Sequence, residues 1–348
     1  MERTEISEIG GEFALIDRIA AATNNTLPET IKGIGDDAAV IDSGEFYTVI
    51  STDMLLEGVH FDLSYVPFKH LGYKAVAVNV SDIAAMNAVP KQITVSIALS
   101  NRIPVEAIDE LYDGIRSACE AYSIDLVGGD TTNSRSGLVI SVTAVGTVAK
   151  DRVTYRSGAK PNDVVCVTGS LGAAYLGLQV LEREKQVFLA DPNMQPELDK
   201  HEYVVAKQLK PEARTDIIYD FIEGGIVPTS MIDISDGLAS EVLHLCKASN
   251  VGIRVFEENI PVENPAMLTA TELNLNPITV ALNGGEDYEL LMTISQADFE
   301  KVKTLSEITP IGFVTEEKGA FLVLNSGQLT PMKAQGWEHF EAWRREEL

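Results

Sequence analysis

Cysteines are scarce in this sequence, and they stand far from one another. Cys119, Cys166 and Cys246 each lie in an apolar stretch, so neither a disulfide framework nor the paired spacing of a zinc site is present. We interpret them as small buried hydrophobic residues of a protein that resides in a reducing compartment.

Long hydrophobic runs are also missing. No apolar stretch approaches the roughly 18–20 residues of a membrane-spanning helix. The N-terminal stretch MERTEISEIGGEF is acidic and lacks the apolar core of a signal peptide. These absences predict a cytoplasmic protein with no membrane partner.

Basic residues are few. The chain has 52 acidic and 27 basic side chains, which gives a formal net charge of −25. Such a charge disfavours binding to nucleic acid or to an anionic membrane. It also leaves few lysines and arginines to neutralise an anionic ligand. Metal ions would resolve this difficulty, because carboxylates bind the cations and the cations bind phosphates.

The familiar nucleotide-binding motifs are absent as well. The sequence contains neither the P-loop pattern GxxxxGK[ST] nor the HRD and DFG motifs of protein kinases. Any nucleotide would therefore be held mainly through metal ions rather than through a Walker lysine.

The length of 348 residues exceeds what one hydrophobic core usually organises. We expect two domains, residues 1–149 and 150–348. The alternation of helical and strand patterns predicts an α/β or α+β fold. Helices are predicted at 12–22, 68–88, 104–122, 171–183 and 237–249, and strands at 46–52, 91–99, 124–129, 138–148, 164–170, 231–235, 251–256, 288–294, 311–314 and 321–324. The polar stretch 184–201 is interpreted as an exposed loop or insertion.

Short acidic or polar motifs with Gly, Ser or Thr are spread over the whole chain, most of them where an apolar run ends. They read GIGDDAAV (33–40), STDMLLEGVHF (51–61), NVSDIAAM (79–86), VGGDTT (127–132), TYRSGAKPND (154–163), IDISDGL (232–238), NGGEDYELL (283–291) and GW (336–337). Carboxylates gathered at strand ends repel one another unless a cation holds them. The pattern therefore indicates divalent metal ions, and metals among glycines indicate a phosphate ligand.

The first three motifs offer hard oxygen ligands. Of the adjacent Asp36 and Asp37 we expect only one to reach a shared metal, because neighbouring side chains of an extended segment point to opposite sides. Ser51-Thr52-Asp53 (51–53) supplies two hydroxyls and a carboxylate at the predicted end of a strand. A turn or helix cap would explain both motifs without a metal. Asp82 lies in an alanine-rich helix, where an unpartnered carboxylate is costly to bury.

The later motifs repeat the combination of glycine and carboxylate. Gly129 would let backbone amides approach a phosphate whose counter-cation Asp130 could hold. Asp233 and Asp236 bracket Ser235 before a helix, although plain helix capping is an alternative. A further pair of glycines precedes Glu286.

Three other residues are candidates on weaker grounds. Arg156 stands out in a chain poor in basic residues, and is either a phosphate clamp or a surface arginine. His60 is either a ligand contact or a packed histidine. Trp337 is either a packing residue or an aromatic lid over a ring.

Taken in order along the chain, these motifs resemble the thiamine-monophosphate kinase family. This family belongs to the ATP-binding superfamily that also contains aminoimidazole ribonucleotide synthetase, selenophosphate synthetase and a hydrogenase maturation protein. The STDM–EGVHF and GGEDYEL stretches distinguish this kinase from the other members. The resemblance runs nearly end to end, beginning at GEF (11–13). One departure is Asn87, where the family often has glycine.

The resemblance implies a two-domain aminoimidazole ribonucleotide synthetase-like fold, a homodimer formed through the N-terminal sheet, and an active site in the cleft between domains. It implies transfer of the ATP γ-phosphate to thiamine monophosphate, which gives thiamine diphosphate. It further implies that several Mg²⁺ ions are held by Asp37, Ser51, Thr52, Asp53, Asp82, Asp130, Asp233 and Asp236. It also implies ATP contacts from Gly129, Asp130, Arg156 and Ser235, and substrate contacts from His60, Glu286 and Trp337.

The expected chemistry fits these residue types. The acceptor is already a phosphate anion, so the reaction needs relief of charge repulsion and in-line positioning rather than a general base, and none is assigned. Two alternatives remain open. One is another ATP-dependent superfamily member acting on a ribotide or small acid; the other is a non-catalytic acidic cation-binding protein.

Overall fold

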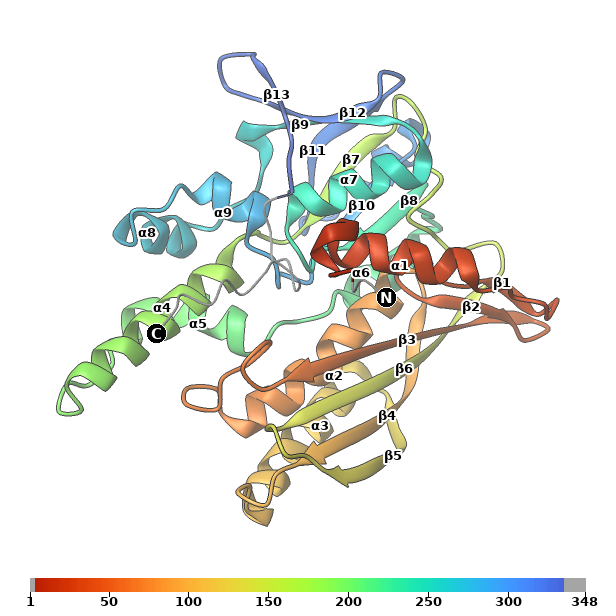
Figure 1. Ribbon diagram of the computed structural model, residues 1–348. Helices are drawn as coiled ribbons and strands as arrows, with labels where there is room; N and C mark the ends of the chain where they lie inside the picture. Colours follow the sequence, from red (N-terminus) through yellow and green to blue (C-terminus); the bar gives the residue numbers. More distant parts are fainter. Residues whose placement is uncertain (1–3, 335–348) are drawn as a thin grey trace.

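A computed structural model of the chain describes residues 4–334 and contains two separate β-sheets (Figure 1). The first is a six-stranded sheet with the order β1-β2-β3-β6-β4-β5, in which only the β4–β5 pair is parallel. Its strands are β1 (Thr30–Lys32), β2 (Ala39–Asp42), β3 (Phe46–Leu56), β4 (Val89–Leu99), β5 (Asp125–Asn133) and β6 (Val139–Ala149).

Helices α2 (Phe68–Ala85) and α3 (Val105–Tyr122) cover one face of this sheet, whereas no helix of residues 4–334 covers the other, open face (Figure 1). Residues alternate between the two faces of a strand. On β6, for example, Ile140, Val142 and Ala144 are buried against the helices. On the open face Met54 is 53% exposed, and every residue of the edge strand β5 is exposed.

The second sheet has seven strands with the order β13-β12-β9-β11-β7-β10-β8. These strands are β7 (Val164–Thr168), β8 (Ser230–Asp233), β9 (Gly252–Phe256), β10 (Leu290–Ile294), β11 (Ile308–Thr315), β12 (Gly319–Val323) and β13 (Leu329–Pro331). The remaining α-helices are α1 (Gly11–Ala22), α4 (Ala173–Ala190), α5 (Glu202–Leu209), α6 (Thr215–Gly224), α7 (Leu238–Ser249), α8 (Asn264–Glu272), α9 (Pro277–Asn283) and α10 (Gln296–Val302). Side chains of α7 pack in one core with strands of this sheet, and side chains of α6 pack in another.

Helix α2 lies between the two halves of the molecule. Its small residues allow close contact on both sides. A Cβ added to Gly72 would lie 2.0 Å from the carbonyl oxygen of Leu111 on α3, and Ala84 and Ala85 pack into a core with residues of α6 and β8. The alanine-rich sequence is therefore a packing requirement, and it brings the end of α2 close to the second sheet.

Several predicted boundaries were wrong. Strand β3 does not stop before Asp53, because its pairing with β6 continues to Leu56. Asp130 does not follow a strand but lies within β5, which runs on to Asn133. The stretch 184–201 is not simply a loop, since α4 continues to Ala190. The short elements β1, β2, β13, α5, α6 and α8–α10 were not predicted.

The first sheet ends at Ala149 and the second begins at Val164. The division at 149/150 stays a prediction. Asn87 is buried in a left-handed conformation with φ 57°, a backbone geometry that glycine and asparagine tolerate best. Within residues 4–334, none of the helices has the length and apolar character needed to cross a membrane.

Candidate active site

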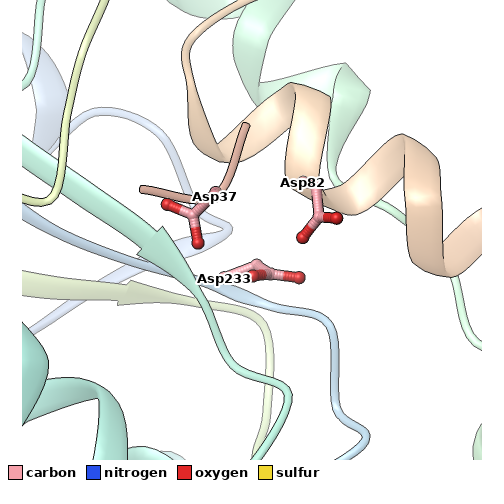
Figure 2. A group of neighbouring side chains, drawn as sticks. All are labelled: Asp37, Asp82 and Asp233. Carbon is pink, nitrogen blue, oxygen red and sulfur yellow. The ribbon is translucent and has the colours of Figure 1, made fainter. Parts of the chain in front are cut away.

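Three aspartates from distant parts of the chain meet at the junction of the two sheets. Asp37 lies in the loop between β1 and β2, Asp82 on α2, and Asp233 at the end of β8. Figure 2 shows their side chains converging, and one carboxylate oxygen from each lies within 4.8 Å of the others. Together these residues form what we call the carboxylate cluster.

Neighbouring side chains orient each member of the carboxylate cluster. The Ser51 hydroxyl donates to Asp82, and the Ser81 hydroxyl donates to Asp233 over 2.6 Å. Arg156 donates from Nη2 to Asp37 Oδ1 over 2.7 Å. Arg156 thus contacts a predicted metal ligand in this structure.

Asp53 and Asp36 lie close to the carboxylate cluster and have partners of their own. The backbone N–H of Asp53 donates to Asn79 Oδ1 over 2.8 Å, which holds β3 against α2. Asp36 turns to Lys32, with 3.2 Å between Lys32 Nζ and Asp36 Oδ2. Asp36 Oδ1 also accepts from the backbone N–H of Arg156 over 3.0 Å, and of the two adjacent aspartates only Asp37 belongs to the carboxylate cluster.

The donor set fits a hard divalent cation. Oδ2 of Asp37 is buried and has no hydrogen-bond partner among the described residues, and a buried charged oxygen without a partner is costly. Three carboxylates face one guanidinium, so negative charge is in excess. Oxygen ligands of this kind are those that Mg²⁺ binds.

Burial shapes the acidity of this site. It raises the pKa of Asp37 to about 7, although Arg156 beside it acts in the opposite direction. Burial raises the pKa of Asp53 and of Asp233 to about 6. It also raises the pKa of Asp82, with a further contribution from the neighbouring aspartates.

These shifts predict that the metal-free protein loses stability as the pH rises from about 4 to about 7. Carboxylates with a raised pKa bind more protons in the folded protein than in the unfolded chain over this range, so the free energy of unfolding falls as they ionise. We expect the melting temperature in EDTA to fall by roughly 5 °C. Saturating Mg²⁺ should abolish the fall, because the ionised carboxylates are the form that binds metal.

Thermal denaturation at several pH values, with EDTA and with Mg²⁺, measures this effect. The Asp233→Asn variant is the matched comparison, and its melting temperature should depend less on pH in EDTA. A wild-type melting temperature that rises across this range in EDTA would contradict the prediction.

The DISDGL and GGEDYEL motifs lie against each other beside the carboxylate cluster. The backbone N–H of Glu286 donates to the carbonyl oxygen of Ser235 over 2.7 Å. A Cβ on Gly285 would lie 2.6 Å from the same oxygen, so this contact requires glycine. Gly237 is the N-cap residue of α7, and the backbone N–H of Asp236 before it donates to the buried Glu241 over 3.0 Å.

A cavity of about 920 Å³ opens beside the carboxylate cluster. Predicted site residues contribute to its wall from both halves of the chain, namely Asp53, His60, Asp82, Asp233, Ser235, Asp236 and Glu286. His60 Nδ1 accepts a hydrogen bond from the backbone of Leu56 over 3.1 Å. The cavity volume is that of a ligand site for small organic molecules.

The stretch that was interpreted as a loop reaches this cavity. Lys185 on α4 lines the wall and donates to Asp62 over 2.6 Å. The Tyr65 hydroxyl donates to Glu182 on the same helix over 2.6 Å. These two hydrogen bonds hold helix α4 against the loop that carries His60. The sequence analysis did not identify Asp62, Tyr65, Glu182 or Lys185 as candidate residues.

Other predicted residues lie away from the carboxylate cluster. Thr52 points to the open face of the first sheet, where its hydroxyl contacts that of Thr143 at 3.1 Å. Asp130 is exposed on β5, and β6 and β4 separate it from β3. A Cβ on Gly129 would lie 1.8 Å from the carbonyl oxygen of Val95, so strand packing alone requires this glycine. Trp337 lies outside the described residues.

The sequence matches the AIR synthase related protein family in both of its domains, the N-terminal domain over residues 35–148 and the C-terminal domain over residues 160–325. A thiamine-monophosphate kinase of Bacillus subtilis (strain 168) is 34% identical over 337 residues, covering 95% of this chain and 99% of that protein. The chain belongs to the thiamine-monophosphate kinase family. The family member of Aquifex aeolicus (strain VF5) is 35% identical over 330 residues, covering 95% of this chain and 98% of that protein.

A solved structure from the thiamine-monophosphate kinase family supports the same assignment. The structure described as AaThiL complexed with AMPPCP and TMP has a TM-score of 0.83 at 33% identity, covering 98% of this chain and 100% of that chain. The two-domain AIR synthase-like fold predicted from the sequence is thereby confirmed.

Proposed function

We propose that this protein transfers the γ-phosphate of ATP to thiamine monophosphate and so forms thiamine diphosphate, the activity for which its family is named. The observation that carries this proposal is the carboxylate cluster beside a cavity of about 920 Å³. A related structure bound to an ATP analogue and TMP supports it.

The roles of the residues follow from their positions. Asp37, Asp82 and Asp233, with Asp53 beside them, would hold Mg²⁺, which when bound offsets the charge of the two approaching phosphates. Arg156 places a fixed positive charge at the same point. His60 and Glu286 line the cavity and would contact the thiamine part of the substrate. No side chain needs to remove a proton, because the acceptor oxygen is already anionic.

We also propose a homodimer formed through the open face and edge of the first sheet. In the strand register Asp130 is opposite Ser96, Ser96 opposite Ser141, and Ser141 opposite Met54. Asp130 is therefore three strands from the neighbourhood of Asp53, roughly 14 Å at ordinary strand spacing. If Asp130 and Gly129 bind ATP, this distance favours a position in the site of the partner subunit.

The exposure of β5 supports the dimer. Val127 is 60% exposed and Leu126 is 37% exposed on this unpaired edge, and an open sheet edge with apolar side chains favours pairing with another chain.

The proposed reaction is tested with purified protein, ATP, Mg²⁺ and thiamine monophosphate, by measuring thiamine diphosphate formed. A superfamily member with another substrate would bind ATP without making thiamine diphosphate. A simple cation-binding protein would bind Mg²⁺ without binding ATP. Absence of thiamine diphosphate in this assay would overturn the proposal. The cytoplasmic location and the lack of a nucleic-acid partner stay predictions.

A further inference from the structure

Lys74 is a buried lysine that takes no part in the proposed phosphoryl transfer. It is 3% exposed, and it lies on the same stripe of α2 as Val78 and Asp82, since these residues are four apart. All three line the cavity. A lysine in this position needs a partner, because an unpaired buried charge is strongly unfavourable.

Its partners come from two other parts of the chain. Lys74 Nζ lies 2.8 Å from Glu286 Oε1 and donates to the backbone oxygen of Gln208 on α5 over 3.3 Å. Gln208 Nε2 in turn donates to Glu286 Oε2 over 2.7 Å. Both carboxylate oxygens of Glu286 are thus held, one by Lys74 and one by Gln208.

The contact with Glu286 also sets the orientation of the Gln208 amide. Reversing the amide would place its oxygen against the carboxylate. In the observed orientation Oε1 of Gln208 is buried without a hydrogen-bond partner among residues 4–334. An unsatisfied buried carbonyl costs roughly 1–3 kcal/mol. The hydrogen bond from Gln208 to Glu286 is therefore formed at the expense of leaving Gln208 Oε1 without a partner.

The backbone of Glu286 is strained as well. Its φ is 58°, in the left-handed region that L-residues with side chains rarely adopt. Such strain persists where the surroundings hold it, and it clusters at ligand sites. The Glu286 side chain remains 28% exposed while Lys74 and Gln208 fix its direction, so its carboxylate is directed by its neighbours and still accessible from the cavity.

The helix also sets a distance. Asp82 lies eight positions after Lys74, which corresponds to about 12 Å along an α-helix. The carboxylate cluster lies at one end of this interval and the Lys74–Glu286–Gln208 group at the other. This length suits an extended ligand with a phosphate at one end and a nitrogen heterocycle at the other.

We propose that Lys74 and Gln208 are positioning residues that hold Glu286 as the acceptor for the N–H groups of the heterocycle at the far end of the substrate. Two turns of α2 set the distance between this recognition point and the phosphate at the carboxylate cluster. The proposal rests on the proposed function, and it adds Lys74 and Gln208 to the residues that determine substrate specificity.

The test compares the binding of two ligands by isothermal titration, in the presence of Mg²⁺ and a non-hydrolysable ATP analogue. One ligand is thiamine monophosphate, and the other is the phosphate of hydroxyethyl-methylthiazole, which lacks the distal pyrimidine ring. We expect Lys74→Met to weaken thiamine monophosphate binding by about 10- to 100-fold, the value of a lost hydrogen bond to a charged group. Binding of the truncated phosphate should change less than about threefold.

Further variants separate positioning from general damage. Lys74→Met introduced into Glu286→Gln should have little additional effect, because Lys74 acts through Glu286. Compared with Lys74→Met, Lys74→Arg should restore part of the preference for thiamine monophosphate over the truncated phosphate. Gln208→Leu should reduce this preference without removing a charge. Lys69→Met, an exposed position on the same helix, is the matched control and should behave as wild type.

Two results would overturn the inference. One is unchanged affinity for both ligands in both Lys74→Met and Gln208→Leu; the other is an equal fold-loss of affinity for both ligands. Either result, with a wild-type protein that makes thiamine diphosphate, removes this inference alone. A wild-type protein that makes no thiamine diphosphate removes the proposed function instead.

Discussion

Replacing Asp82 by Asn is expected to lower kcat for thiamine diphosphate formation by about 10³-fold while raising the melting temperature of the metal-free protein. Asp82 is the member of the carboxylate cluster supplied by α2, and its charge lies close to those of Asp53, Asp233 and Asp37. Loss of the charge would remove a proposed metal ligand, and it also removes repulsion among carboxylates that are close together in the absence of metal.

Steady-state kinetics and thermal denaturation in EDTA measure the two effects. Asp109→Asn provides the control, because it makes the same change at an exposed position on α3. It should leave both quantities close to wild type. An Asp82→Asn protein that keeps more than a tenth of wild-type kcat would show that the carboxylate cluster does not hold the catalytic metal.

Mixing two inactive variants, Asp82→Asn and Asp130→Asn, is expected to restore about one quarter of wild-type activity. If Asp130 acts in the site of the partner subunit, a mixed dimer has one site that lacks both carboxylates and one that is intact. Random exchange of subunits makes half of the dimers mixed, so a quarter of all sites are intact. The expectation that Asp130 acts in the site of the partner subunit rests on the fold, because β6 and β4 separate β5 from β3.

The measurement requires co-expression of the two variants with different tags, followed by purification of the mixed dimer. The isolated mixed dimer should have half of wild-type activity. A doubly substituted chain, Asp82→Asn with Asp130→Asn, mixed with wild type is the control, since every mixed dimer then carries only damaged sites. No recovery in the first mixture, with dimers demonstrated by light scattering, would place Asp130 outside the site of the partner.

Much of the carboxylate cluster could be predicted from sequence, because each aspartate has a local signal. Asp82 is a carboxylate in an alanine-rich helix, and Asp233 ends an apolar strand. Sequence alone could not show that these two meet Asp37 and leave Asp130 outside. That outcome depends on strand order, in which β5 is at the far edge of the first sheet.

The residues that were missed have partners remote in sequence. Lys74 looks like an ordinary helical lysine until Glu286 is placed beside it. A signal did exist, since Lys74 is two turns before Asp82 on the same stripe of α2. Lys185 was missed because the polar composition of 184–201 hid the continuation of α4. The ATP-binding role of Gly129 stays a prediction, because close strand packing also requires glycine at this position.

The origin of the carboxylate cluster in opposite halves of the chain also has a consequence during synthesis on the ribosome. Asp37 and Asp82 emerge early, but Asp233 is at the end of β8, which pairs with the later strand β10 (Leu290–Ile294). A nascent chain that has completed only its first sheet holds an incomplete set of ligands. We therefore expect the complete carboxylate cluster to form only after the ribosome has translated the chain beyond β10.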